Sequence, residues 1–332
     1  MNDYKFKVYY IDIQDSDEIK STQKQLDVAN AKLIPIKTPK VEKELINKIK
    51  DADGLIVVES QINENIINNL EKCKVILRTG VGFDVININA ANKKNIAIVN
   101  VPDLWTREVA NHAMALLLNL NRKISISQRD IQNHLWTPTL PYKVGSLYKE
   151  TLGIIGLGRI GSETAKRAIS FDLNVIAYDP YQNEEYFNKR KVTKVNLEEL
   201  LIKSDYISLH CPLNKETSHI INKSTLSLMK KSALIINTSR GPVINEKDLI
   251  EALNDGEISG AGLDVLEKEP PDENNPLLNM NNAIVSPHSA HYSNESMKTR
   301  YIRFGSEVAK VLNGYMPLNL VNKDISNNLK LK

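Results

Sequence analysis

The chain has 332 residues and a formal net charge of +3, with 42% apolar and 25% charged residues. Because a domain usually holds about 100 to 200 residues, this length predicts two domains that can each bury a sizeable core. The charges are spread along the chain, which argues against a nucleic-acid partner. No stretch approaches the roughly 18 consecutive apolar residues of a membrane span, so we expect no membrane partner.

The two cysteines, Cys73 and Cys211, form neither a disulfide framework nor a metal-binding spacing. The start of the chain lacks the long apolar stretch of a signal peptide. We therefore expect a protein of the reducing cytoplasm.

Short apolar runs alternate with helical patterns from the start of the chain, which is typical of parallel β-α-β units. In the first part of the chain the runs predict a small parallel sheet, with strands at 5–13, 31–36, 54–59, 74–80 and 95–100. The pattern breaks at NVPDLW, 100–105, and a long helix with a broad apolar face follows at 107–124. The first domain boundary is expected in this stretch.

A second series of strands is predicted at 152–156, 174–179, 206–211, 233–238, 260–265 and 283–287. Helix start signals lie between them, at Asn196 with Glu199 and at Asn245 with Asp248. An amphipathic helix is expected at 294–314. The fold class is therefore α/β, with two parallel sheets.

The sequence GLGRIG, 156–161, directly follows a predicted strand and opens a helical run. Gly156 permits a tight turn, Gly158 lets the backbone approach a pyrophosphate, and Gly161 allows close packing of helix on strand. The next strand ends in Asp179, whose carboxylate would bind the ribose hydroxyls of NAD and repel the 2′-phosphate of NADP. This order of features predicts an NAD site; the alternative is a glycine-rich turn beside a solvated aspartate.

Ligands of open α/β sheets bind at the carboxyl ends of the strands, so polar residues just past those ends are candidate site residues. These are Gly156, Asp179, His210, Cys211, Thr238, Ser239, Arg240, Asp264, Glu269 and His288.

Three of these residues could assist the reduction of a 2-oxo acid beside a nicotinamide. The cofactor supplies the hydride, so the protein has to supply only a proton and the groups that bind the substrate. Arg240 could hold the substrate carboxylate or ketone oxygen, although a surface salt bridge is an ordinary role for such an arginine. Glu269 could orient the ring of His288 and favour its protonated form, which would leave the other ring nitrogen facing the substrate.

The motifs GLGRIG, HCPLNKET (210–217), NTSRGPVINEKDLIEAL (237–253), GAGLDVLEKEP (260–270) and SPHSAHYS (286–293) resemble those of the D-isomer-specific 2-hydroxyacid dehydrogenases. The resemblance covers nearly the whole chain. It implies a flavodoxin-like substrate domain, 1–101 with 288–332, and an inserted Rossmann-type NAD domain, 102–287. It also implies a cleft that closes over substrate and a homodimer formed through the NAD domain.

Within the family, RTGVGFDVIN (78–87), AYDPY (177–181), HSAHYS and GYMPLNLVNK (314–323) look most like the branch that includes the C-terminal-binding proteins, which are NAD-sensing co-repressors. An NAD-dependent 2-oxo-acid reductase is the function that the resemblance favours. An NAD(H)-sensing binding protein and a 3-phosphoglycerate dehydrogenase remain alternatives.

The resemblance implies a role for each candidate residue. Arg240 would anchor the substrate, Glu269 would hold the histidine, and His288 would donate the proton. Substrate contacts are expected from Arg78, Val81, Gly82 and His291. Cofactor contacts are expected from Thr106, Gly156, Gly158, Arg159, Ile160, Gly161, Asp179, Cys211, Pro212, Thr238, Ser239 and Asp264, with Asp264 at the nicotinamide amide.

The chain departs from the family at two positions. Asn111 stands where many members have an acidic residue, so an interaction is expected to be lost there. His291 stands where the animal co-repressors have a pocket tryptophan, and it either sets substrate choice or lies on the first turn of the last helix. Trp105 either lines the pocket or packs in an interface. A metal site at His288 and His291 would need a third ligand, and Glu269 serves better to orient His288, so we predict no metal.

Overall fold

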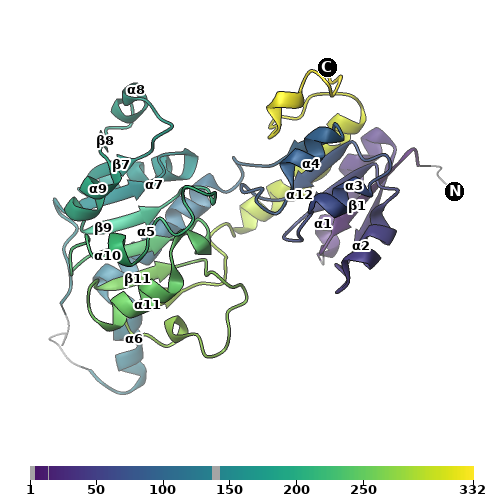
Figure 1. The fold of residues 1–332 in the computed structure, drawn as a ribbon. Coiled ribbons are helices and arrows are strands. Elements are labelled where there is room, and N and C mark those ends of the chain that lie inside the picture. The colour runs from purple at the N-terminus through teal and green to yellow at the C-terminus, as the bar shows by residue number, and fades with distance from the viewer. Residues whose placement is uncertain (1–3, 14, 137–142) are drawn as a thin grey trace. The chain divides into compact units, whose positions relative to one another are not determined.

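The computed structural model describes residues 4–13, 15–136 and 143–332. The chain divides into two compact units, one formed by Met1–Leu104 with Ser293–Lys332 and the other by Trp105–Tyr292. Each unit has its own parallel sheet and its own helices (Figure 1). The chain passes from one unit to the other after Leu104 and again after Tyr292, a few residues beyond the boundaries expected from the sequence. His288 therefore belongs to the second unit.

The first unit contains a five-stranded parallel sheet in the order β2-β1-β3-β4-β5. Its strands are β1 (Phe6–Ile11), β2 (Ala31–Ile36), β3 (Gly54–Val57), β4 (Val75–Arg78) and β5 (Ala97–Val99). Its helices are α1 (Ser16–Leu26), α2 (Glu42–Ile49), α3 (Glu64–Asn68), α4 (Ile88–Lys93) and α12 (Asn294–Leu312). Helix α12 comes from the end of the chain and packs against α1 (Figure 1), which brings the two segments of this unit together.

The second unit contains a seven-stranded parallel sheet in the order β12-β11-β10-β9-β6-β7-β8. Its strands are β6 (Thr151–Ile155), β7 (Asn174–Tyr178), β8 (Thr193–Lys194), β9 (Tyr206–Leu209), β10 (Leu234–Asn237), β11 (Gly260–Leu263) and β12 (Ala283–Val285). Its helices are α5 (Thr106–Arg122), α6 (Ile124–Gln132), α7 (Arg159–Ser170), α8 (Glu184–Asn188), α9 (Leu197–Lys203), α10 (Lys223–Leu226) and α11 (Glu246–Asn254). The predicted α/β class with two parallel sheets is confirmed.

Both faces of the second sheet are buried, because successive side chains of a strand point to opposite faces. Ile154 packs in a cluster with residues of α5 and α7, whereas its neighbour Ile155 packs in a second cluster with residues of α9 and α11. Burying one such side chain contributes roughly 1.5 to 3 kcal/mol. This two-sided core explains why the strands read as continuous apolar runs in the sequence.

The expected helix starts are confirmed by their caps. The Asn196 side chain accepts a hydrogen bond from the N–H of Glu199 at 2.8 Å, and Asn245 does the same for Asp248 at 3.1 Å. Strand β8 was not expected; it has only two residues and pairs with β7 at the edge of the sheet. Within the described residues, no helix has the length and apolarity needed to span a membrane.

Candidate active site

The glycine loop between β6 and α7 is shaped by close backbone contacts. Gly156 has a left-handed φ of +93°, and a Cβ there would lie 2.7 Å from the backbone nitrogen of Cys211. A Cβ at Gly161 would lie 2.2 Å from the carbonyl oxygen of Gly156, whereas one at Gly158 would meet no atom within 4 Å. Glycine is therefore required at the first and third positions for packing, and the second position borders open space.

Helix α7 begins at Arg159, directly after Gly158. Gly158 is its N-cap and provides no side-chain hydrogen bond, so the first N–H groups of the helix, which include those of Arg159 and Ile160, receive no side-chain cap. Uncapped N–H groups at the positive end of a helix dipole attract anions. The loop therefore fits the pyrophosphate of a dinucleotide.

Asp179 follows β7 and is held against the glycine loop. Its Oδ2 accepts a hydrogen bond from the N–H of Leu157 at 2.9 Å, and its Oδ1 accepts one from the N–H of Tyr181 at 3.0 Å. The side chain is buried, but each carboxylate oxygen can accept more than one hydrogen bond. Asp179 thus fixes the shape of the loop and still fits a ribose hydroxyl.

Two buried polar atoms at the same edge of the sheet have no hydrogen-bond partner within the described residues, namely Nδ1 of His210 and Oγ1 of Thr238. The two residues follow β9 and β10, adjacent strands in which Leu209 is opposite Asn237. Buried polar atoms in folded proteins nearly always have partners. The pair therefore indicates that a ligand completes this edge, as a bound NAD would.

Neither neighbouring titratable group brings a charge to this edge. Burial lowers the pKa of His210 to about 3, so its ring is neutral at ordinary pH. Burial raises the pKa of Cys211 to about 12, so its thiol stays protonated. His210 is consequently unsuited to donate a catalytic proton, which leaves that role to a histidine elsewhere in the unit.

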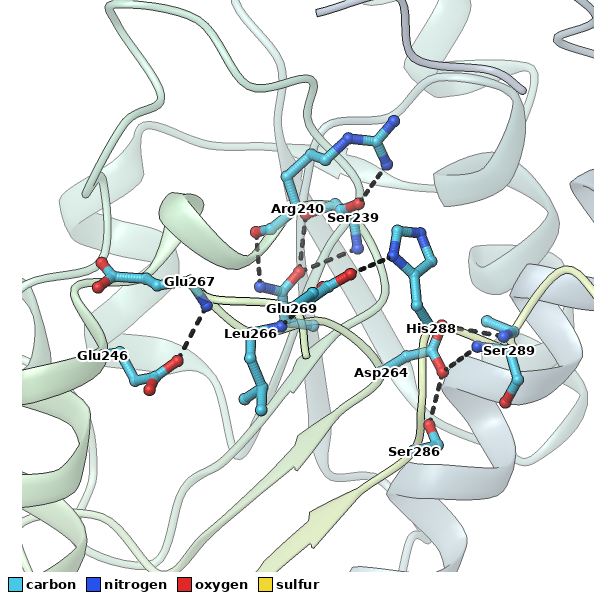
Figure 2. A network of polar contacts seen from close by, with 12 residues as sticks. Ser239, Arg240, Glu246, Asp264, Leu266, Glu267, Glu269, Ser286, His288 and Ser289 are labelled. Carbon is cyan, nitrogen blue, oxygen red and sulfur yellow. Dashed lines mark hydrogen bonds and ion pairs between the residues drawn. The ribbon is translucent and has the colours of Figure 1, made fainter. Parts of the chain in front are cut away.

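Arg240 stands on a turn that the buried side chain of Asn237 fixes. Asn237 Oδ1 accepts hydrogen bonds from the N–H of Ser239 at 2.9 Å and from its hydroxyl at 2.7 Å. Asn237 Nδ2 donates to the carbonyl oxygen of Arg240 at 2.9 Å. The guanidinium Nη1 donates to the carbonyl oxygen of Ser239 at 2.8 Å (Figure 2).

Gly241 lets this turn approach the segment that contains Glu269. A Cβ at Gly241 would lie 1.9 Å from the carbonyl oxygen of Leu266, closer than any side chain can come. The N–H of Leu266 in turn donates to Oε1 of Glu269 at 3.0 Å. The turn of Arg240 and the segment that precedes Glu269 are therefore in close backbone contact.

Glu269 and His288 form a direct pair. His288 Nδ1 lies 2.6 Å from Glu269 Oε2, and the side chains are 32% and 34% exposed, respectively. A carboxylate can only accept from Nδ1, so Nδ1 has the hydrogen and Nε2 is left for a substrate. Burial alone would raise the pKa of Glu269, but the hydrogen bond and charge of His288, with help from the Leu266 N–H and Arg240, hold that pKa below its ordinary 4.5.

His288 itself sits in a left-handed turn, with φ of +50°. The buried carboxylate of Asp264 binds the next residues of this turn, because Oδ1 accepts from the N–H of Ser289 and Oδ2 from that of Ala290, each at 2.9 Å. The N–H of His288 donates to the carbonyl oxygen of Asp264 at 2.8 Å. Asp264, expected at the nicotinamide amide, is thus also the residue that holds the turn of His288.

His291 does not lie on the last helix, so that alternative is wrong. The N-cap of α12 is Ser293, whose side chain accepts from the N–H of Ser296, and the helix starts at Asn294. The His291 ring instead meets the buried Trp105 edge-on with centroids 5.7 Å apart, and its centroid is 6.4 Å from that of His288. Trp105 is therefore part of the surroundings of the two histidines, within the second unit.

Asn111 makes a hydrogen bond between two helices. Asn111 Oδ1 accepts a hydrogen bond from Arg167 Nε at 2.6 Å, which links α5 to α7. Arg167 also pairs with Glu163 at 2.6 Å, so its charge is compensated locally. The loss of an interaction expected at this position stays a prediction.

Two remaining expected cofactor residues lie at the start of α5 and in the segment after β9. Thr106 is the first residue of α5, and Pro212 follows Cys211, where its carbonyl oxygen accepts from the hydroxyl of Thr217 at 2.5 Å. Within the described residues, no group of three or more His, Cys, Asp or Glu side chains is arranged to hold a metal ion.

The expected substrate residues Arg78, Val81 and Gly82 lie in the first unit. Arg78 ends β4, and its guanidinium folds over Gly80, where a Cβ would lie 1.4 Å from one of its nitrogens. The carbonyl oxygen of Val81 accepts from Asn100 Nδ2 at 2.6 Å. The side chains of Arg78 and Asn100 thus both contact this loop, and the cation of Arg78 lies at its start.

The sequence analysis missed three polar side chains that contact the expected site residues. Asn237 fixes the turn of Arg240. Ser286 donates a hydrogen bond to Asp264, and His112 contacts Ser286 and lies 3.5 Å from Asp264. A signal existed for Asn237 and Ser286, which stand at strand ends beside predicted site residues. None existed for His112, which lies inside a long helix.

A family model describes the same part of the chain. The NAD-binding domain of the D-isomer-specific 2-hydroxyacid dehydrogenases matches residues 114–290. This chain belongs to that family. The second unit is therefore the family's NAD-binding domain, and the cofactor is NAD.

Individual relatives agree with this assignment. The chain is 41% identical over 291 residues to D-3-phosphoglycerate dehydrogenase of Methanocaldococcus jannaschii, covering 87% of this chain but 55% of that protein. It is 35% identical to glyoxylate reductase of Korarchaeum cryptofilum, covering 86% of this chain and 88% of that protein. The solved D-lactate dehydrogenase of Aquifex aeolicus, complexed with NAD and lactic acid, superposes with a TM-score of 0.86 at 29% identity over 95% of this chain and 99% of that one.

These relatives confirm the two-sheet fold with a Rossmann NAD domain and the dehydrogenase family. They do not test the finer resemblance to the co-repressor branch, which stays a prediction. The chain spans about half the length of the archaeal phosphoglycerate dehydrogenase and most of the length of the glyoxylate reductase.

Proposed function

We propose that the protein is an NAD-dependent D-2-hydroxyacid dehydrogenase that works mainly as a 2-oxo-acid reductase. The observation that supports this best is the pairing of His288 with the ionised Glu269 at 2.6 Å, beside Arg240 and at the carboxyl edge of the NAD-binding sheet. An acid, its orienting carboxylate and an anion-binding cation are the groups that this reaction requires from a protein.

The side chains perform separate parts of the reaction. Bound NADH supplies the hydride that reduces the carbonyl carbon, C2. Arg240 binds the substrate carboxylate or its ketone oxygen through paired N–H donors. His288 donates the proton on Nε2 to the oxygen as negative charge develops there, and Glu269 stabilises the imidazolium and fixes the ring. In the oxidative direction neutral His288 accepts the same proton.

The Arg78–Gly82 loop is proposed as a second binding element for the substrate carboxylate. Arg78 would contribute charge, and the backbone N–H groups of Val81 and Gly82 would contribute hydrogen bonds. Replacement of Arg78 by Gln is expected to raise KM for the oxo acid more than it lowers kcat, because carboxylate binding is shared by ground state and transition state.

A substrate panel tests the proposal directly. Purified protein is assayed for NADH oxidation with glyoxylate, pyruvate, hydroxypyruvate, 3-phosphohydroxypyruvate and branched, aromatic and thioether 2-oxo acids, with NADPH as the cofactor control. The expected result is turnover of at least one oxo acid and its loss in His288→Gln. Tight NADH binding without turnover of any member would overturn the reductase assignment.

We also propose that the protein is a homodimer formed through the second unit. Helix α6 has no buried residue, and apolar side chains on and just after it are strongly exposed: Ile124 (57%), Ile131 (44%), Leu135 (55%) and Trp136 (81%). Large exposed apolar patches are typical of interfaces. Light scattering after gel filtration is expected to give twice the mass of one chain, and Trp136→Lys with Leu135→Lys to shift it toward a monomer.

A further inference from the structure

We propose that His112 and Ser286 are positioning residues for the proton donor, acting on His288 through Asp264. This inference rests on the proposed function, since it concerns the same histidine. All four residues belong to the second unit, although His112 comes from the middle of α5 and the others from the ends of β11 and β12.

The contacts form a continuous chain. His112 Nε2 lies 2.8 Å from Ser286 Oγ, and Ser286 Oγ donates to Asp264 Oδ1 at 2.6 Å. A serine hydroxyl has one hydrogen, and here it is given to the carboxylate, so Ser286 must accept from His112. His112 therefore has its proton on Nε2, which also lies 3.5 Å from Asp264 Oδ1.

Asp264 connects these contacts to the turn that contains His288. Its carboxylate is 2% exposed and also accepts from the N–H groups of Ser289 and Ala290. A left-handed backbone costs a residue other than glycine roughly 1 to 2 kcal/mol, so the φ of +50° at His288 persists only while the turn is tied down. The ring of His288 reaches Glu269 from this backbone position.

A loosened turn would change the surroundings of the His288 ring as well as the rate of the reaction. Among the described residues, Glu269 pairs with the ring, and the ring of His291 is 6.4 Å away. The charge of Arg240 acts on Glu269. Moving the ring away from Glu269 would therefore change the environment of the ring atoms.

Four variants test the inference. Ser286→Ala removes the link without adding bulk, and His112→Leu removes the donor. His112→Gln places an N–H donor close to the position of Nε2 and is the conservative replacement. Ser227→Ala is the matched control, because its hydroxyl donates to the Ser224 carbonyl oxygen, at 2.8 Å, on the surface of the same unit.

Two measurements are made on each protein. The first is kcat and KM for NADH-dependent reduction of the best oxo acid. The second is the position of the His288 imidazole signals in 1H–13C NMR spectra at one fixed pH, assigned by their absence in His288→Gln, which requires no turnover. Thermal melting confirms that each variant is folded; if His112→Leu is not, Ser286→Ala decides.

The expected result is a kcat lowered about tenfold to a hundredfold in Ser286→Ala and His112→Leu, with little change in the KM for NADH, since small displacements of a catalytic group have effects of this size. The NMR signals of the His288 imidazole are expected to move in both. His112→Gln and Ser227→Ala should resemble the wild type. Wild-type imidazole signals and wild-type kcat in Ser286→Ala would overturn the inference. A wild-type protein without turnover, whose His288 signals still respond to Ser286→Ala, would instead contradict the proposed function alone.

Discussion

The carboxylate of Glu269 accepts a hydrogen bond from Nδ1 of His288 at 2.6 Å, and Nε2 of the same ring has no protein partner within the described residues. This division of the two ring nitrogens is the arrangement that a general acid needs. His288→Gln is expected to lower kcat for reduction about 10²-fold to 10⁴-fold. NADH binding, followed by fluorescence titration, should be unchanged, and wild-type turnover in this variant would remove His288 from the mechanism.

Reduction by the wild type should fall and oxidation should rise as the pH increases, because reduction uses imidazolium and oxidation uses neutral imidazole. Glu269→Gln keeps a hydrogen-bond acceptor but removes the charge that stabilises imidazolium. The midpoint of the reduction profile is therefore expected at lower pH in this variant. Profiles of kcat/KM between pH 5 and 9 check this, and superimposable profiles would contradict it.

Glu269 should also make the stability of the protein depend on pH in the acid range. Its pKa is held below 4.5 in the folded protein, so the folded state favours the carboxylate more than the unfolded state does. The resulting stabilisation is present above about pH 4.5 and is lost as the pH falls through the folded-state pKa. Urea unfolding of wild type and Glu269→Gln should show a stability difference that shrinks on acidification; a difference that grows would have the wrong sign.

Asp179 should decide between the two nicotinamide dinucleotides. Asp179→Asn keeps the hydrogen-bond geometry at Leu157 or Tyr181 but removes the charge that repels a 2′-phosphate. NADH binding is expected to weaken about tenfold, since hydrogen bonds to a charged group are worth roughly 1.5 to 3 kcal/mol, while NADPH binding improves. Dissociation constants for both cofactors check this, with the exposed Asp255→Asn as the control.

Gly241 is expected to tolerate no side chain. An alanine Cβ would lie 1.9 Å from the Leu266 carbonyl oxygen and 2.5 Å from the Glu267 nitrogen, both of which are backbone atoms that cannot rotate away. Gly241→Ala should destabilise the protein by at least about 1 to 3 kcal/mol, as overpacking does, and should lower kcat by moving Arg240 away from Glu269. Thermal melting and steady-state kinetics measure the two effects; an unchanged melting temperature would show that the turn is free to move.

The sequence was sufficient for elements that follow local rules. The strands, the caps at Asn196 and Asn245 and the glycine loop depend on neighbours along the chain, and the residues at strand ends identified Arg240, Glu269 and His288. Contacts between residues that are far apart in the sequence could not be predicted in this way. His112 and Ser286 are 174 positions apart, and only the packing of α5 beside β11 and β12 brings them together.

Two other differences between the expectations and the structure also have physical causes. His291 lies two residues before Ser293, the N-cap of α12, and the capping-box partner of Ser293 is Ser296, not the acidic residue that would reveal the box in the sequence. Strand β8 is too short to show alternation, so only pairing with β7 defines it.

The left-handed turn at His288 places activity and stability in opposition at one residue. Glycine and asparagine adopt this backbone more readily than histidine does, so His288→Gly or His288→Asn would relieve the turn while abolishing proton transfer. Either replacement would also remove the partner of Glu269 and the stabilisation that comes with this pair. The net change in stability therefore compares the strain of one backbone turn with the energy of one hydrogen bond.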